Sequence, residues 1–448
     1  MVVAQKGIIA AVVQIGGPTS VINKSLKGTV CCLKERNARI LGARHGINGI
    51  MQNDFFRLDL FSESKLDSAL KAPGSYLGTS EYRIGKENVQ EVVANLKKSN
   101  VNYFYMIGGD TTAGIANMIQ LAAKEANYEL TVVHIPKTID NDLALTDHSP
   151  GYGTAAKYVA MAAFGLDQEN RSKPGIYFTI TMGRDSGFLA AASSLLRMSD
   201  ESGPHLIYLP EKHFNEQDFL KDVDNILSKN KSRVAGEWVK PRAFIVFSEG
   251  IRQYENGDVN GKHELVMDIA ARHFNEKIVT EKMMGRELTS KSEGSVVLAN
   301  YLKELLKKNF PRIERVKDGI LGHIQRSFPI VSDVDALEAE YVGRKAVEFS
   351  VGSGGNSGSV ILRRTGDGHT YSIRAEYAPL DAIAGKAMQM PQEFICSYGK
   401  DITMAFKQYA APLIGVGGLG EFDKDYLLPQ GFDIREIIPK QDRWNGAG

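Results

Sequence analysis

A short acidic turn carries the residues of this chain best suited to chemistry. Asp140 and Asp142 stand two residues apart, directly after Lys137 and Thr138. Phosphoryl transfer uses such groups, because one carboxylate takes the proton of the attacking hydroxyl, another holds Mg²⁺, and a cation neutralises the charge that moves. Aspartate-rich turns also serve simply to cap backbone groups. The turn therefore predicts phosphoryl transfer only if its neighbours support that chemistry.

Three glycine turns supply such neighbours. Gly16-Gly17 follows the apolar run 7–15, Gly108-Gly109-Asp110 follows 103–107, and 183–187 follows 176–182. Glycine lets backbone N–H groups approach phosphate oxygens, and a helix N-terminus adds partial positive charge. We expect these turns and the acidic turn to meet at one sheet edge, beyond the carboxyl ends of the strands. No predicted strand leads into a G-x-G-x-x-G helix start or a G-x-x-x-x-G-K-[ST] loop, which disfavours a dehydrogenase or P-loop enzyme.

The elements that must position these turns alternate along the chain. Apolar runs predict strands at 7–15, 39–43, 103–107, 131–135, 176–182, 205–209, 243–247, 317–322 and 358–363. Amphipathic segments predict helices at 21–36, 88–98, 113–126, 153–167 and 186–197. This alternation predicts an α/β protein, and 448 residues exceed what one core usually organises. We therefore expect two doubly wound, Rossmann-like domains with parallel-rich sheets and the active site in the cleft between them.

Composition and charge narrow the partners. The 54 Lys and Arg residues nearly balance 53 Asp and Glu residues, so a net charge of +1 offers no attraction to nucleic acid or an anionic membrane. No stretch approaches the roughly 20 apolar residues that a membrane span needs. Cys31, Cys32 and Cys396 are too few for a disulfide framework and indicate free thiols in a reducing compartment. These features predict a cytoplasmic protein with neither nucleic acid nor membrane as partner.

Six ordered segments give a more specific indication. They are 16–23 (GGPTSVIN), 108–110 (GGD), 136–142 (PKTIDND), 182–190 (MGRDSGFLA), 247–250 (FSEG) and 321–326 (LGHIQR). In this order the chain resembles the phosphofructokinases, and most closely their pyrophosphate-dependent branch, over roughly residues 7 to 410. The resemblance implies Mg²⁺ as cofactor and pyrophosphate as donor. It also implies transfer to the 1-hydroxyl of fructose 6-phosphate, giving fructose 1,6-bisphosphate, by a homo-oligomer, either a dimer or a tetramer.

The same resemblance implies roles for individual residues. Asp140 is expected to be the general base, with Lys137, Thr138 and Arg184 as further catalytic residues and Asp110 and Asp142 as metal ligands. The expected substrate-binding residues are Gly17, Asp142, Met182, Gly183, Glu249, Lys317, His323 and Arg326. It also implies a phosphoryl-donor domain of residues 1–151 plus about 327–390, a sugar-phosphate domain of 152–326, and a C-terminal extension of about 391–448.

Four positions depart from the resembled pattern. Thr111 follows the triplet 108–110 (GGD), where ATP-using members of the resembled family have glycine and pyrophosphate users have a second aspartate. Glu81, Gly175 and Lys317 stand where the family commonly has arginine. A lysine offers a point charge but no bidentate geometry for a phosphate. These positions keep three alternatives open: an unphosphorylated sugar or polyol such as inositol as acceptor, ATP as donor, and a catalytically weak regulatory or binding paralogue.

Overall fold

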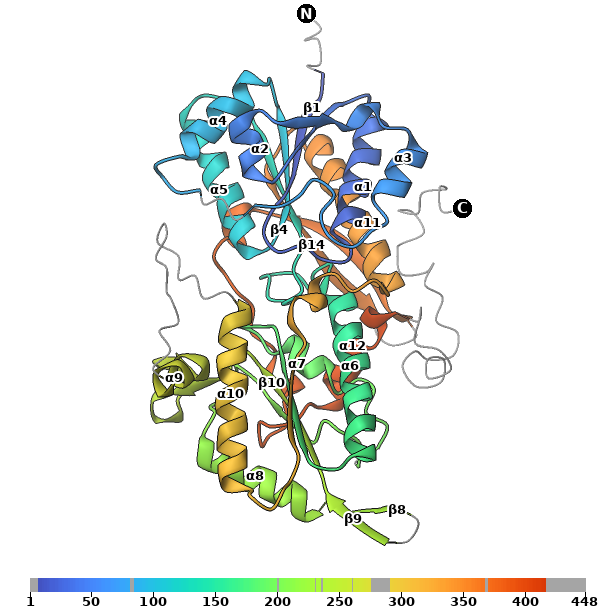
Figure 1. Ribbon diagram of the computed structural model, residues 1–448. Coiled ribbons are helices and arrows are strands. Elements are labelled where there is room, and N and C mark those ends of the chain that lie inside the picture. The colour runs from blue at the N-terminus through green and yellow to red at the C-terminus, as the bar shows by residue number, and fades with distance from the viewer. Residues whose placement is uncertain are drawn as a thin grey trace, which may run out of the picture.

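Two β-sheets organise the chain, one in each lobe of the computed structural model (Figure 1). The structure describes residues 7–80, 84–199, 201–229, 231–234, 237–259, 261–274, 291–366 and 370–415. Glu81 and the chain beyond 415 therefore lie outside the described residues. Within the described part, no helix is both long and apolar enough to cross a membrane.

The upper sheet has seven strands in the order β15-β14-β5-β4-β1-β2-β3. Its inner pairs are parallel, and only the outermost pairs, β2 with β3 and β14 with β15, are antiparallel. Since β1 lies between β2 and β4, the strand order reverses there, which is where such sheets bind ligands. The strands are β1 (Ile9–Gln14), β2 (Arg39–Ala43), β3 (Phe55–Arg57), β4 (Tyr103–Gly108), β5 (Thr131–Pro136), β14 (Gly358–Gly366) and β15 (Ser372–Ala378).

The lower sheet has four parallel strands in the order β13-β6-β10-β7. They are β6 (Ile176–Thr181), β7 (Leu206–Tyr208), β10 (Ala243–Ser248) and β13 (Val316–Ile320). Two antiparallel hairpins lie outside it, β8 (Lys231–Val234) with β9 (Glu237–Pro241) and β11 (Arg252–Tyr254) with β12 (His263–Leu265).

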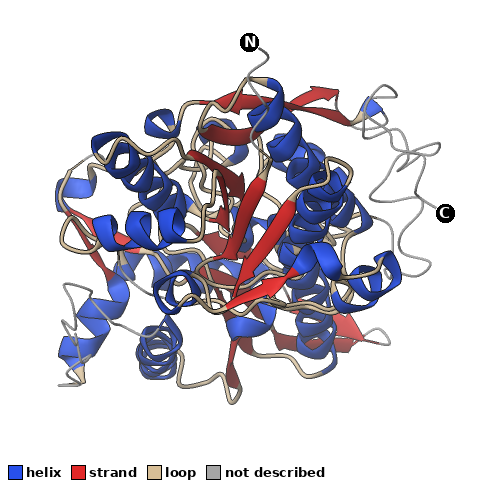
Figure 2. Ribbon diagram, turned by 90° about the horizontal axis from the view of Figure 1, so that it is seen from above, coloured by secondary structure: helices blue, strands red, loops and turns tan. Residues whose placement is uncertain are grey.

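Helices cover both faces of each sheet (Figure 2). On the upper sheet, α1 and α11 pack on one face, and α2, α4 and α5 on the other. On the lower sheet, α6 and α7 pack on one face, and α8, α9 and α10 on the other. The helices are α1 (Ile22–Lys34), α2 (Ile47–Gln52), α3 (Glu63–Ala69), α4 (Val89–Lys98), α5 (Asp110–Glu125), α6 (Tyr152–Ser172), α7 (Phe188–Ala192), α8 (Glu216–Lys229), α9 (Val266–His273), α10 (Lys291–Asn309), α11 (Asp333–Gly352) and α12 (Met404–Ala410).

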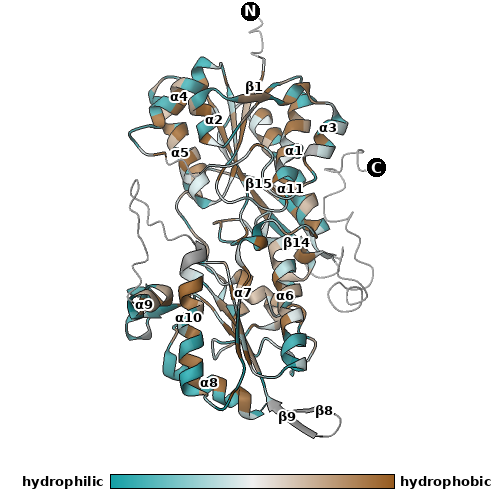
Figure 3. Ribbon diagram, viewed as in Figure 1, coloured by the Kyte–Doolittle hydropathy of each residue, from teal (hydrophilic) through white to brown (hydrophobic). Residues whose placement is uncertain are grey.

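The alternation of side chains explains why inner strands such as β10 are almost entirely apolar. In β10, Ile245 and Phe247 enter the core under α8 to α10, whereas Phe244 and Val246 enter the core under α6 and α7. Successive residues of a strand point to opposite faces, so a sheet covered on both sides needs continuous apolar runs. The hydropathy colouring shows these hydrophobic strands beneath helices such as α4 and α8 that carry both colours (Figure 3).

Each predicted strand is present, with ends shifted by at most three residues, and four of the five predicted helices keep most of their length. The helix predicted at 186–197 is wrong in extent, since α7 covers only Phe188–Ala192. The hydroxyls of Ser193 and Ser194 donate to the carbonyls three residues earlier, at 2.5 and 2.8 Å, and this bonding competes with a continued helix.

Candidate active site

The four predicted turns come from both sheets, so the expectation of a single sheet edge was wrong. Three of them follow β1, β4 and β5 of the upper sheet, and the turn 183–187 follows β6 of the lower sheet. The two sets nevertheless meet, because Ser186 Oγ donates to the carbonyl oxygen of Asp140 at 2.6 Å. The carboxyl ends of the two sheets therefore face each other across the predicted catalytic residues.

The acidic turn is held by its own polar residues. Asn141, fully buried and left-handed at φ 59°, separates Asp140 from Asp142. Its Oδ1 accepts from Ser149 N at 2.9 Å. Asp140 N donates to Thr138 Oγ1 at 3.1 Å. Asparagine tolerates a positive φ better than most residues, so the sequence Asp-Asn-Asp suits a sharp turn between two carboxylates.

Asp142 shows the electrostatic character of this site. Burial, followed by the charges of Asp140, Asp110 and Asp185, raises the pKa of Asp142 to about 7. A divalent cation relieves such repulsion, and carboxylate oxygens are the ligands that Mg²⁺ prefers. Among the described residues, no three acidic, histidine or cysteine side chains are close enough to form a complete metal site. The repulsion between Asp142 and its neighbouring carboxylates is what fits Mg²⁺, which commonly takes one or two carboxylates and completes its shell with phosphate oxygens and water.

Lys137 and Arg326 meet at the first glycine turn. Lys137 Nζ donates to the carbonyl oxygen of Gly17 at 2.7 Å, and its side chain is buried. A Cβ atom on Gly17 would lie 2.8 Å from the guanidinium carbon of Arg326, so the guanidinium lies directly against this glycine. Arg326 comes from the 3₁₀ turn Gly322–Arg326 of the lower lobe. The turn after β1 therefore has two cations beside it, one from each lobe, where an anionic substrate can be held.

His134 supports the turn after β4 from behind. Its Nε2 lies 2.9 Å from the carbonyl oxygen of Gly108, which also accepts from Lys137 N, and its Nδ1 lies 2.8 Å from Ser359 Oγ. Burial lowers the pKa of His134 to about 4, so the ring is neutral near pH 7. Sequence reasoning missed this residue, although a histidine inside the apolar run 131–135 is itself a signal of a buried hydrogen bond.

The turn after β6 is closely packed. Gly183 has φ +113°, and a Cβ on Gly250 would lie 1.9 Å from the carbonyl oxygen of Arg184. Met182 N donates to Gln325 Oε1 at 3.2 Å, which ties the turn to 321–326. Glu249 is buried and accepts from Ser295 Oγ at 3.1 Å. A small cavity of about 10 Å³ brings together three of the predicted substrate-binding residues, Met182, Glu249 and His323.

Lys317 is not brought to these turns. It lies exposed on the edge strand β13, in register with Tyr177, four residues before Thr181 at the end of β6. Four residues of strand correspond to about 13 Å, so Lys317 lies toward the amino ends of these strands. The prediction that it binds substrate has no support within one chain.

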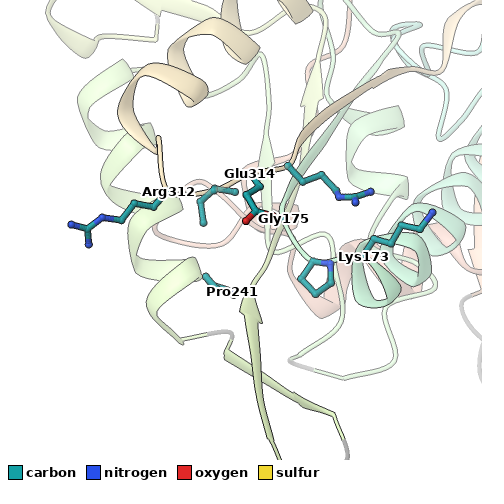
Figure 4. A pocket seen from close by; sticks show the side chains of 8 residues that line it. Lys173, Gly175, Pro241, Arg312 and Glu314 are labelled. Atoms are coloured by element: carbon teal, nitrogen blue, oxygen red, sulfur yellow. The ribbon is translucent and has the colours of Figure 1, made fainter.

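Gly175 also lies at the amino ends of the lower strands, beside a cavity of about 460 Å³. The cavity is thus remote from the acidic turn. Two of its labelled cations, Arg312 and Lys173, point away from one another (Figure 4).

Comparisons with known proteins agree with this geometry. A family model described as phosphofructokinase matches residues 9–350. A pyrophosphate--fructose 6-phosphate 1-phosphotransferase of Rhodospirillum rubrum is 37% identical over 415 residues, covering 91% of this chain and 94% of the relative. A sulfofructose kinase of Alkalicoccus urumqiensis is 29% identical and covers 86% of this chain and 91% of its own length.

A solved structure shares the fold. The pyrophosphate-dependent phosphofructokinase of Nitrosospira multiformis superposes with a TM-score of 0.73 at 26% identity, covering 94% of this chain and 98% of the other. Its match includes both sheets, since it extends over nearly the whole described chain. Together with the family model over most of the chain, this likeness identifies the protein as a member of the phosphofructokinase family.

Proposed function

We propose that this protein transfers a phosphoryl group from pyrophosphate to the 1-hydroxyl of fructose 6-phosphate, giving fructose 1,6-bisphosphate. The observation that carries the proposal is the set of aspartates 110, 140 and 142, facing a turn that Lys137 and Arg326 border from opposite lobes. Retention of all three carboxylates, despite their mutual repulsion, argues against a merely regulatory paralogue. The relative from Rhodospirillum rubrum supports both the donor and the acceptor.

Asp140 acts as the general base. It takes the proton of the sugar hydroxyl while that oxygen attacks one phosphorus of pyrophosphate, and the bond from this phosphorus to the bridging oxygen breaks to release phosphate. Asp110 and Asp142 would hold Mg²⁺, which would supply Lewis-acid neutralisation of the charge on pyrophosphate. Lys137, Thr138 and Arg184 then stabilise the charge that shifts onto the leaving phosphate. This electrostatic stabilisation provides most of the catalysis of phosphoryl transfer.

The lower lobe binds the sugar phosphate. Met182, Gly183 and Glu249 lie at the carboxyl ends of its strands, and His323 and Arg326 lie three residues apart on one 3₁₀ turn. Such a pair of basic side chains holds a terminal phosphate with a cation and hydrogen-bond donors. The Arg326 guanidinium also lies against Gly17 of the upper lobe.

The two lobes divide this work. The donor domain consists of residues 1–151 plus about 327–390, since β14 and β15 join the upper sheet and α11 packs on α1. The sugar-phosphate domain consists of 152–326, and about 391–448 forms a C-terminal extension. We further propose a cytoplasmic homo-oligomer, in which the exposed Lys317 is available to a neighbouring copy.

A matrix of donors and acceptors tests this function. Purified protein with Mg²⁺ is offered pyrophosphate or ATP, each with fructose 6-phosphate, sulfofructose or free inositol. We expect turnover with pyrophosphate and fructose 6-phosphate to exceed every other pair in kcat/KM. Preference for sulfofructose or inositol would keep the chemistry but replace the acceptor, and preference for ATP would replace the donor. No turnover with any pair, together with measurable ligand binding, would favour a binding paralogue.

A further inference from the structure

The segment from Ala387 to Tyr409 contacts the acidic turn 137–142 directly and reaches the turn 183–187 through Glu211, although the family model ends at residue 350. These two turns are called the catalytic turns below. We propose that this segment is a positioning element of the active site, and that Tyr409 and Glu211 fix the two catalytic turns through it. The proposal rests on the function proposed above. It adds two residues that act without touching the substrates. Glu211 lies within the matched family region, and Tyr409 lies beyond it.

The start of the segment pairs with the acidic turn. Met388 N donates to the carbonyl oxygen of Asp142 at 2.6 Å, and Ala387 forms an antiparallel bridge with Leu143. Both contacts are made by backbone groups, so they fix the chain direction immediately after Asp142. The position of the Asp142 carboxylate thus depends on a strand-like contact from more than 240 residues further along the sequence.

Two residues later the same segment reaches the lower lobe. Met390 N donates to Glu211 Oε1 at 3.1 Å, and the same oxygen accepts from Gly187 N at 2.9 Å. Glu211 is buried, and a Cβ on Gly187 would lie 2.7 Å from its second carboxyl oxygen. Gly187 closes the turn that carries Arg184. One carboxyl group therefore ties this turn to the segment that also holds the acidic turn.

Tyr409 holds the centre of the acidic turn. Its hydroxyl accepts from Asn141 Nδ2 at 2.8 Å and donates to the carbonyl oxygen of Asp147 at 2.9 Å. Its ring packs against Phe394 at 5.1 Å between centroids, and the Arg364 guanidinium lies 4.6 Å from the ring centre. The ring is thus fixed by packing while the hydroxyl alone bridges the two ends of the loop 141–147.

These contacts have a catalytic consequence. Asn141 lies between the proposed base and a proposed metal ligand, so a shift of Asn141 moves both carboxylates. A misplacement of about 1 Å in a phosphoryl-transfer site can cost 10²-fold in rate. Loss of the Tyr409 hydroxyl leaves the ring packing in place but removes the bridge. It should therefore lower kcat and leave substrate affinity nearly unchanged.

The test compares Tyr409→Phe with Tyr398→Phe, a control in the same segment whose side chain is exposed. We expect Tyr409→Phe to lower kcat at least tenfold, with KM for pyrophosphate and fructose 6-phosphate changed less than twofold. Tyr398→Phe should keep both constants. Unchanged kcat in Tyr409→Phe, or a fall in kcat matched by an equal fall in the control, would overturn the proposal.

Glu211 gives a second pair of variants in case Tyr409→Phe is poorly folded. Glu211→Gln keeps an oxygen that accepts from Gly187 and Met390, so we expect it to retain kcat within threefold, whereas Glu211→Ala should lose at least tenfold. Equal loss in both would contradict a role through these hydrogen bonds.

Hydrogen exchange separates this proposal from the proposed function. Tyr409→Phe should speed amide exchange in peptides covering 138–147, and Tyr398→Phe should not, even if the substrates are not those proposed. A wild-type protein without turnover would overturn the function alone. Unchanged exchange in Tyr409→Phe would overturn the positioning role, whatever the activity.

Discussion

Thr111 follows Asp110 in the first turn of α5, and its hydroxyl donates to Asp110 Oδ1 at 3.3 Å. Its side chain is exposed beside the proposed metal ligand Asp110, where a β-branched residue restricts space. We expect Thr111→Gly to raise kcat/KM for ATP relative to pyrophosphate by about tenfold, since one or two apolar carbons in a pocket discriminate at this level. Steady-state kinetics with both donors measures the ratio, and Thr111→Ser controls for the hydroxyl. An unchanged ratio would show that Thr111 does not select the donor.

At the residue scale, the sequence predicted what short motifs specify and missed what the fold supplies. Asp140, Lys137 and Arg184 stand in motifs whose composition already indicates their chemistry. His134 and Glu211 act through backbone groups that are remote in sequence. The position of His134 inside an apolar run indicates a buried hydrogen bond but not its partner, and no local pattern indicates the role of Glu211. Lys317 was predicted only from its distance along the sequence to the motif 321–326. Such a distance does not show at which end of a strand a side chain lies.

At the scale of elements, the close packing of Gly250 against the Arg184 turn leads to a prediction. A Cβ at residue 250 would lie 1.9 Å from a backbone oxygen, so Gly250→Ala must displace this turn. We expect a loss of about 1–3 kcal/mol in the free energy of unfolding and a fall in kcat. Denaturant unfolding and kinetics measure both.

Gly165→Ala is the matched control for that prediction. Gly165 lies in α6, and a Cβ there has open space. Alanine favours a helix interior over glycine by about 0.5–1 kcal/mol, so this variant should be neutral or stabilised. If both variants behave alike, the close approach at Gly250 is not what holds the Arg184 turn.

Elements were predictable where their pattern was simple. Apolar runs indicated nine of the eleven strands of the two sheets, all but the edge strands β3 and β15, because a covered sheet buries most side chains of its inner strands. Helix α11 was missed because Asp335, Glu338 and Ser350 are buried within it and interrupt the apolar pattern. Buried polar residues of this kind are satisfied by distant partners, such as Gly151 N on Asp335, and a sequence does not disclose those partners.

At the scale of the whole molecule, a buried network joins the acidic loop to α11 and β14. His148 lies between Asp147 and Glu338, Tyr371 donates to Glu338, and Arg364 pairs with Asp147. Burial opposes the charged imidazolium, but the charge of Glu338 and hydrogen bonds to both carboxylates outweigh it and raise the pKa of His148 to about 9. His148 is therefore cationic at pH 7 and joins distant parts of the chain.

This network predicts how stability depends on pH. The folded pKa of about 9 exceeds the ordinary value of 6.5, so the stabilisation is complete below pH 6.5 and is lost as pH rises to 9. The difference between these two pKa values corresponds to about 3 kcal/mol in the free energy of unfolding. Burial raises the pKa values of Tyr371 and Tyr409, so both stay neutral in this window. Between pH 6.5 and 9, the free energy of unfolding measured in urea should fall more steeply with pH for the wild type than for His148→Gln. Equal slopes of this free energy against pH in the two proteins would contradict the role of His148.

The two-lobe arrangement was predictable from length and alternation, but the assignment of turns to sheets was not. Four similar strand-to-turn segments give no sign of which strands pair, because pairing depends on contacts across hundreds of residues. The return of β14 and β15 to the upper sheet likewise rests on packing of α11 against α1 through Gly28 and Gly343.

The central claim is that Asp140 is the base for phosphoryl transfer, and Asp140→Asn tests it most directly. Asp185→Asn serves as control, since this exposed carboxylate belongs to the same charged region but pairs with Arg252. With pyrophosphate and fructose 6-phosphate, the account predicts that Asp140→Asn lowers kcat by about 10²–10⁴, while calorimetry shows fructose 6-phosphate binding within threefold of wild type. Turnover by Asp140→Asn equal to that of wild type would contradict the account.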